Sequence, residues 1–155
     1  MDSPRRSGLT TAAEIGLAHW FFGNLYEEVV RMPARVAEQP TTGGPFAPGS
    51  PVRYYVPAAP VTLATTFACI AAGWRRRTAR PALGAAALLT ATGAALTGHL
   101  VTAVNLRLLD DAKRPADPDE RQRLVRHWHR VNRVRLVAVA AAAVALRAGT
   151  RAGRR

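Results

Sequence analysis

Carboxylate, amide, imidazole and guanidinium groups recur at helical spacing within apolar segments of this 155-residue sequence. Groups of these types transfer protons and hold negatively charged oxygens when they are buried together. In the segment 9–31, Glu14 and Glu28 fall on one stripe of a helix. Asn24 and Arg31 lie on the adjacent stripe. We expect this flank to face the interior of a helical bundle, because ionisable groups are costly in apolar surroundings.

Two further apolar segments carry polar groups at comparable spacing. His99 and Asn105 lie close together in helical projection. Trp128, Asn132 and Arg135 follow the spacing i, i+4, i+7, which places all three on one helix face. These faces are therefore candidates to meet the polar flank of the first segment.

The elements that position these groups are predicted to be membrane helices. Residues 54–74 and 81–106 carry no formal charge, and each run is long enough to cross a hydrocarbon core of about 30 Å. A soluble bundle would show a polar face on each helix, and these runs show none. We predict an all-α fold, a four-transmembrane-helix up-and-down bundle forming one domain over residues 1–155. Its helices are expected at 9–31, 57–74, 81–109 and 124–147, with a Pro- and Gly-rich loop at 34–56.

An up-and-down topology gathers the polar groups in one half of the bundle. The end of the first helix, the start of the second, the end of the third and the start of the fourth share one membrane face. This half therefore holds a predicted pocket, and the other half is built from Ala, Leu, Val and Thr. The candidate catalytic residues are Glu28, His99, Arg135, Asn105 and Asn132. The candidate substrate-binding residues are Asn24, Trp128, Tyr54, Tyr55, Glu14 and Trp20.

The charge balance indicates a lipid bilayer as the main partner. The chain has 22 Lys and Arg residues and a net charge of +12, but the arginines occur in blocks that flank apolar segments. That distribution is typical of membrane helices, whereas a nucleic-acid binder gathers basic residues on one folded face. We expect no nucleic-acid partner. The short cluster at 75–80 favours cytoplasmic termini in a bacterial-type cell membrane. Gly84, Gly93 and Gly98 permit close helix packing and homo-association.

Metal and cofactor signals are weak in this sequence. Cys69 is the single cysteine, which excludes an internal disulfide and a cysteine zinc cluster. His19 and His99 differ in depth, which disfavours bis-histidine haem ligation. His19 and Glu27 are expected to point toward another helix or the lipid headgroups. No phosphate loop, nucleophile elbow, dinucleotide-binding pattern or paired metal motif occurs, so we expect no metal and no cofactor.

Three short motifs resemble the anthrone-oxygenase-like family of small four-helix membrane proteins. They are Val30-Arg31-Met32-Pro33, Val104-Asn105-Leu106 and Trp128-x-x-x-Asn132-x-x-Arg135. The resemblance implies cofactor-independent oxygenation of a lipophilic aromatic substrate, with some members attached to aromatic polyketide pathways.

The resemblance also implies roles for the candidate residues. Glu28 or His99 would be the base that removes an acidic proton from the substrate. Arg135, Asn105 and Asn132 would donate hydrogen bonds to the developing oxyanion. Trp128 and the Tyr54–Tyr55 pair would stack on a flat ring system.

Two other functions remain open from the sequence. A protonated Glu28 would allow the pocket to start the cyclisation or isomerisation of an isoprenoid epoxide or alkene. Alternatively, the pocket belongs to a non-catalytic membrane scaffold that binds a lipid or a neighbouring helix. Consumption of dioxygen separates oxygenation from cyclisation, and a scaffold shows neither reaction.

Overall fold

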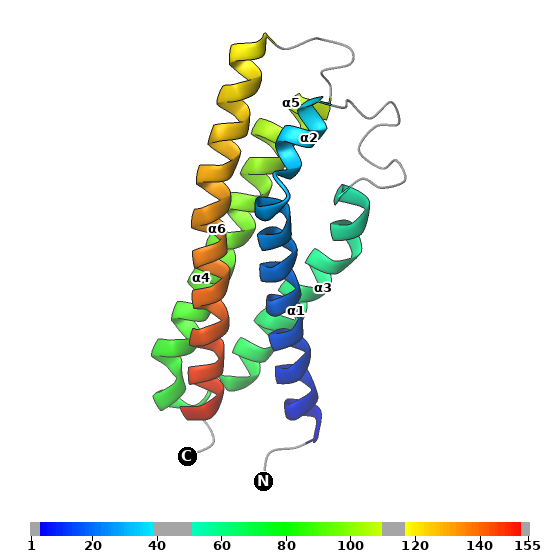
Figure 1. Ribbon diagram of the computed structural model, residues 1–155. Coiled ribbons are helices and arrows are strands. Elements are labelled where there is room, and N and C mark those ends of the chain that lie inside the picture. The colour runs from blue at the N-terminus through cyan, green and yellow to red at the C-terminus, as the bar shows by residue number, and fades with distance from the viewer. Residues whose placement is uncertain (1–3, 39–50, 110–116, 153–155) are drawn as a thin grey trace.

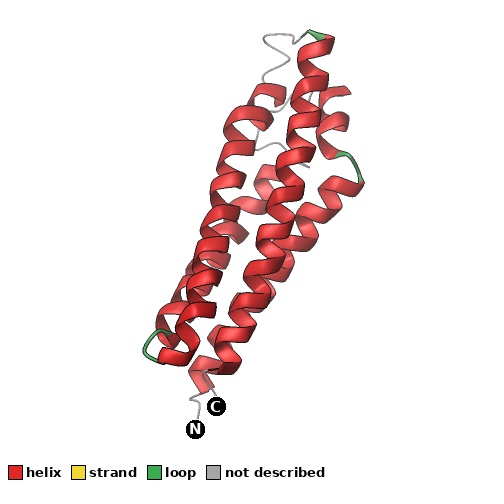
Figure 2. Ribbon diagram, turned by 90° about the vertical axis from the view of Figure 1, so that its left-hand side faces the viewer, coloured by secondary structure: helices red, strands yellow, loops and turns green. Residues whose placement is uncertain are grey.

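The computed structural model describes residues 4–38, 51–109 and 117–152. Regular structure within these ranges is entirely helical, which confirms the predicted all-α class. The elements are α1 (Pro4–Val29), α2 (Met32–Glu38), α3 (Pro51–Gly73), the 3-10 helix η1 (Arg77–Ala79), α4 (Arg80–Leu100), the π-helix η2 (Val101–Asn105), α5 (Leu106–Leu109) and α6 (Pro118–Ala152). The long helices α1, α3, α4 and α6 alternate in direction along one axis, and α1 begins at the end where α6 finishes (Figure 1, Figure 2).

Helix α3 begins earlier than the sequence predicted. It starts at Pro51, whose fixed φ and missing N–H suit the first position of a helix. Pro57 and Pro60 remain inside it. The predicted loop 34–56 was therefore too long at both ends, since α2 also continues to Glu38. The rest of that loop, residues 39–50, lies outside the described residues.

Helix α6 is longer than predicted at both ends. It begins at Pro118 and carries Asp119 and Glu120 in its first turn, where acidic groups complement the partial positive charge of a helix N-terminus. The prediction placed the helix at 124–147 because the flanking residues are charged. Charged side chains do not end a helix when they face outward, and α6 runs on to Ala152.

The break between α1 and α2 lies at Arg31, two residues beyond the last residue of α1. Its backbone adopts a φ of 51°, in the left-handed region that is uncommon for residues other than glycine. The backbone N–H of Arg31 still bonds to the Glu28 carbonyl at 3.3 Å, and α2 restarts at Met32 with Pro33 in its first turn. The predicted helix 9–31 therefore ends at Val29, a two-residue turn of Val30 and Arg31 follows, and a second short helix begins at Met32.

The core follows a regular alternation of three and four residues along each long helix. On α1 the buried positions are Ala13, Leu17, Trp20, Asn24 and Glu27. On α4 they include Leu83, Ala86, Thr90, Gly93 and Leu100, and on α6 Trp128, Asn132, Arg135, Val139, Ala142, Leu146 and Gly149. A 3.5-residue repeat keeps one seam of each helix facing its neighbours. α6 packs against both α4 and α1 along this seam.

Two glycines bring the helices close together. A Cβ added at Gly93 would lie 3.1 Å from Val139 Cγ2 and 3.3 Å from Trp20 Cη2. A Cβ at Gly149 would lie 2.7 Å from Leu83 Cδ2. Close approach at Gly93, expected from the sequence, therefore serves packing within one chain.

The four predicted membrane spans are not all recognisable in the described helices. One helical stretch, Arg77–Leu108, is long and apolar enough to cross a membrane, with a mean hydropathy of 1.4 over its best window. A shorter apolar stretch covers Pro57–Gly73. Within α1 and α6, carboxylates and arginines interrupt the apolar residues, so length and composition identify a single candidate span in the described part of the chain.

Candidate functional site

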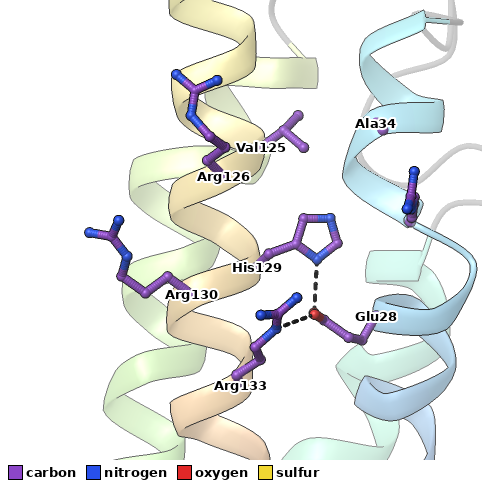
Figure 3. A pocket seen from close by; sticks show the side chains of 8 residues that line it. Glu28, Ala34, Val125, Arg126, His129, Arg130 and Arg133 are labelled. Atoms are coloured by element: carbon purple, nitrogen blue, oxygen red, sulfur yellow. Dashed lines mark hydrogen bonds and ion pairs between the residues drawn. The ribbon is translucent and has the colours of Figure 1, made fainter.

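Glu28 joins α1 to α6 through three hydrogen bonds. Its Oε2 accepts from His129 Nδ1 and from Asn132 Nδ2, both at 2.9 Å, and its Oε1 accepts from Arg133 Nε at 2.8 Å. Figure 3 shows His129 and Arg133 reaching from α6 toward this carboxylate on α1. Donors of this kind are those that satisfy an ionised carboxylate.

Asn132 connects Glu28 to a buried charged pair. Its Oδ1 accepts from Arg135 Nε at 3.1 Å and from Nη2 at 2.6 Å. Arg135 Nη2 also lies 3.6 Å from Glu27 Oε2 on α1, and its Nη1 donates to Thr97 Oγ1 on α4 at 3.3 Å. Arg135 is 5% exposed and Glu27 is 9% exposed. Because an unpaired buried charge is costly, the pair and its hydrogen bonds must form together.

Two further side chains complete this polar network. The guanidinium carbon of Arg135 lies 5.9 Å from the centre of the Trp128 ring, within the range of a cation–π contact. Asn24 is buried, and its backbone carbonyl accepts from Asn132 Nδ2 at 3.3 Å. The side-chain Nδ2 of Asn24 has no hydrogen-bond partner among the described residues.

The structure unites several of the predicted site residues. Glu28, Asn132 and Arg135, predicted as catalytic, belong to one connected network, together with Asn24 and Trp128 from the substrate-binding set. The i, i+4, i+7 spacing on α6 holds because that helix is regular from Pro118 to Ala152.

Other predicted site residues lie away from the network. His99 is exposed, and its Nε2 lies 2.9 Å from His127 Nε2 on the outer side of the bundle. The inward positions of α4 are Thr97 and Leu100, so residue 99 points outward. Asn105 is half-buried and ends the π-helix η2, whose wider turns invalidate a regular helical projection beyond Leu100. None of the hydrogen bonds of the network involves Asn105.

The remaining substrate-binding candidates have other surroundings. Glu14 is half-buried and lies more than two turns before Asn24 on α1. Trp20 is a core residue that packs at Gly93. Tyr54 and Tyr55 lie in the first turns of α3, and their side chains fall outside what the structure describes.

Sequence reasoning missed three members of the network. Glu27 was expected to point toward another helix or the lipid headgroups, outside the polar flank. It does face another helix, α6, but as a member of the buried network, because it continues the four–three spacing of Trp20 and Asn24. His129 precedes Asn132 by three residues and therefore shares its helix face. Thr97 follows the buried Thr90 by seven residues. Tracing the buried alternation along each helix finds Glu27 and Thr97.

A groove adjoins the network between α1, α2 and α6. Its volume is about 690 Å³. It is lined by Glu28, Arg31, Ala34, Val125, Arg126, His129, Arg130 and Arg133. The sequence predicted a dry pocket in this half of the bundle, but the groove is open to the surroundings and rich in arginine.

The fold and the network define an all-helical protein with a carboxylate–guanidinium pair buried between three helices. The sequence matches the family described as anthrone oxygenase over residues 51–145, and the chain belongs to that family. The match includes Thr97, Trp128, Asn132 and Arg135, whereas the carboxylates of α1 precede it. No curated protein and no solved structure matches the chain significantly.

Proposed function

We propose that this protein is an integral membrane enzyme of natural-product biosynthesis that oxygenates a lipophilic polycyclic substrate without a cofactor. Its membership of the anthrone oxygenase family supports the general kind of reaction. The buried pair of Glu27 and Arg135, with the unpartnered Asn24 amide beside it, is the observation that carries the proposal.

The membrane location is supported by the outer face of the bundle. Only 22% of the apolar window in α4 is buried within the chain, whereas the core helix of a soluble protein is mostly buried. Leu88 on α4 is 69% exposed, and Val137 and Val144 on α6 are each 70% exposed. Lipid tails would cover these side chains. We propose that α1, α3, α4 and α6 cross the bilayer as a four-helix bundle, with lipophilic substrate arriving from the membrane.

The proposed reaction begins with loss of a proton. A methylene carbon between two aryl rings and opposite a ring carbonyl is acidic, because its carbanion is an enolate. The enolate passes one electron to dioxygen, and the resulting carbon radical and superoxide combine with a proton to form a hydroperoxide. Loss of water from the hydroperoxide leaves a second carbonyl. One dioxygen is thus consumed, and one water is released, for each quinone formed.

Glu27 is the proposed base. Its carboxylate faces Arg135 at 3.6 Å, longer than a direct hydrogen bond, while Glu28 is held by three donors at 2.8–2.9 Å. The carboxylate of Glu27 is therefore engaged by fewer short hydrogen bonds than the carboxylate of Glu28. This replaces the two bases expected from the sequence, because His99 is exposed and Glu28 is already hydrogen-bonded.

Arg135 and Asn24 are the proposed stabilisers of the enolate oxygen. Arg135 is fixed by Asn132 and Thr97, so its charge is oriented before substrate binds. The Asn24 amide supplies a donor with no competing partner among the described residues. Preoriented donors in a water-poor site stabilise a developing oxyanion without reorganisation.

The proposal is tested by measuring oxygen uptake and quinone formation with anthrone, using the full chain reconstituted in lipid vesicles. Empty vesicles measure spontaneous oxidation. We expect one dioxygen consumed per quinone and a rate well above the empty vesicles. Arg135→Gln should lower the rate by about 100-fold or more, as loss of an oxyanion donor does elsewhere. Arg147→Gln removes the same charge at the other end of α6 and should leave the rate unchanged.

Three results would contradict the proposal. A wild-type rate equal to that of empty vesicles would show that the protein does not catalyse oxygenation of anthrones. Equal rates for wild type and a folded Arg135→Gln variant would show that the network around Arg135 is not the active site. Product formation from an isoprenoid epoxide without dioxygen would instead favour the cyclase that the sequence left open.

A further inference from the structure

The groove between α1, α2 and α6 carries a surplus of positive charge. Four arginines and one glutamate line it, which leaves three positive charges in excess when His129 is neutral. Arg133 is paired with Glu28. Arg31 and Arg130 form no ion pair with a described carboxylate, and Arg126 bonds only to the neutral Gln122, at 3.2 Å. A cleft lined by one sign of charge concentrates ions of the opposite sign.

The one carboxylate that lines the groove is already paired, so it would repel a bound anion only weakly. Glu28 is neutralised by Arg133 and hydrogen-bonded by His129 and Asn132. Figure 3 shows Arg126 and Arg130 extending from successive turns of α6, neither of them linked to this carboxylate. Arg130 therefore keeps its donors for a ligand, and Arg126 keeps those that Gln122 does not accept.

Arg31 adds a second, independent observation. It is the described non-glycine residue with a positive φ, at 51°, and it stands in the groove wall where α1 gives way to α2. A residue of this type in the left-handed region costs about 1 kcal/mol or more, and such strain gathers at ligand-binding positions. Glycine or asparagine would fit this backbone with less strain. An arginine here therefore points to a requirement for its side chain.

We propose that this groove binds the phosphate group of a ligand. Guanidinium groups match phosphate oxygens in charge and in planar, paired hydrogen bonds. Three uncompensated positive charges favour a phosphate over a carboxylate, because a phosphate monoester carries up to two negative charges and a diester, although singly charged, presents its oxygens to several donors at once. The volume of about 690 Å³ exceeds that of a phosphate ion, so the phosphate belongs to a larger molecule. That molecule is either an anionic phospholipid or a soluble phosphate ester. This site is separate from the proposed oxygenation and does not depend on it.

The test uses the full chain in phosphate-free, non-ionic detergent at constant ionic strength. One arm titrates inorganic phosphate. The other adds phosphatidylglycerol to the micelles. Binding is followed by calorimetry and by the shift in unfolding temperature. The variants are Arg130→Gln and Arg31→Asn, the second of which should fold at least as well as wild type because asparagine tolerates a positive φ. Arg147→Gln on α6 is the control for loss of one charge.

We expect one or both probes to bind wild type and Arg147→Gln equally, and each groove variant at least about tenfold more weakly, since each loses a charge-assisted hydrogen bond. Groove-dependent binding of phosphatidylglycerol alone identifies a lipid headgroup as the ligand. Groove-dependent binding of inorganic phosphate identifies a soluble phosphate ester. If neither probe binds, or if Arg147→Gln weakens binding as much as Arg130→Gln, the proposal is overturned.

Discussion

The two halves of the bundle are made from the same helices and the same alternating spacing, yet they differ in what that spacing buries. Near the end where α1 begins, the inward positions hold Ala13, Leu17, Leu83 and Leu146. Toward the other end of α1, the corresponding positions hold Asn24 and Glu27. The geometry that interlocks apolar side chains in one half aligns a carboxylate with a guanidinium in the other. The repeat fixes which positions face inward, and the residue type decides whether such a position packs against apolar side chains or joins the polar network.

This comparison also explains why the long helices differ in hydropathy. α4 carries apolar residues along its whole length, whereas the first half of α6 is charged and its second half is rich in alanine and valine. Hydropathy therefore identifies α4 as part of a candidate membrane span and does not identify α6 as one. A helix that supplies a polar site loses the composition by which a span is recognised.

The largest loss of stability is expected when the buried ion pair in the polar half is broken. Replacing Arg135 with Met leaves Glu27 buried without its cation and should destabilise the protein by about 3–5 kcal/mol. The double variant Glu27→Leu with Arg135→Met removes both charges and should recover most of that loss. Thermal unfolding in detergent measures both. If the double variant is as unstable as Arg135→Met, the two side chains are not a coupled pair.

A smaller loss of stability is expected from overpacking the apolar half. Gly149→Ala places a Cβ 2.7 Å from Leu83 Cδ2 and should cost about 1–3 kcal/mol through overpacking. Gly98→Ala is its matched control, because no atom of another helix lies within 4 Å of the added Cβ. Alanine there should stabilise α4 by about 0.5–1 kcal/mol through helix propensity. Equal unfolding temperatures for the two variants would mean that α4 and α6 do not approach as described.

The smallest effect concerns the surface end of the network. The side chain of Arg133 is 73% exposed, so Arg133→Ala should lower stability by only about 0.2–1 kcal/mol, and less at high salt. Chemical unfolding at two salt concentrations tests this. A loss that rivals that of Arg135→Met would show that the Glu28 contacts, rather than the buried pair, hold α1 against α6.

How far the site follows from sequence depends on helix regularity. The alignment of Trp128, Asn132 and Arg135 was predictable because α6 is one unbroken helix. Asn105 was placed wrongly because the π-helix after α4 changes the angular positions of the residues that follow Leu100. No residue in the sequence indicates that a π-helix forms there. His99 was misplaced by counting polar neighbours instead of buried ones.

Glu27 was left out of the predicted site for a different reason. The sequence offers two adjacent carboxylates, and Glu28, two seven-residue steps after Glu14, was favoured because it shares the helix stripe of Glu14. The inward register of α1 is set by its contacts with α3 and α6, and these place Trp20, Asn24 and Glu27 inside. A choice between neighbouring residues on one helix requires knowledge of what that helix packs against. The groove beside Arg31 also needed the break after α1, which a regular helix to residue 31 conceals.

If Glu27 is the base, as proposed, the rate of anthrone oxidation by Glu27→Gln is the most direct measurement of its role. Glu14→Gln makes the same change on the same helix, away from the network, and serves as the control. A general base contributes about 100-fold to 10,000-fold to the rate, so we predict a loss of at least 100-fold in Glu27→Gln and none in Glu14→Gln. A folded Glu27→Gln protein that consumes oxygen as fast as Glu14→Gln would contradict the account.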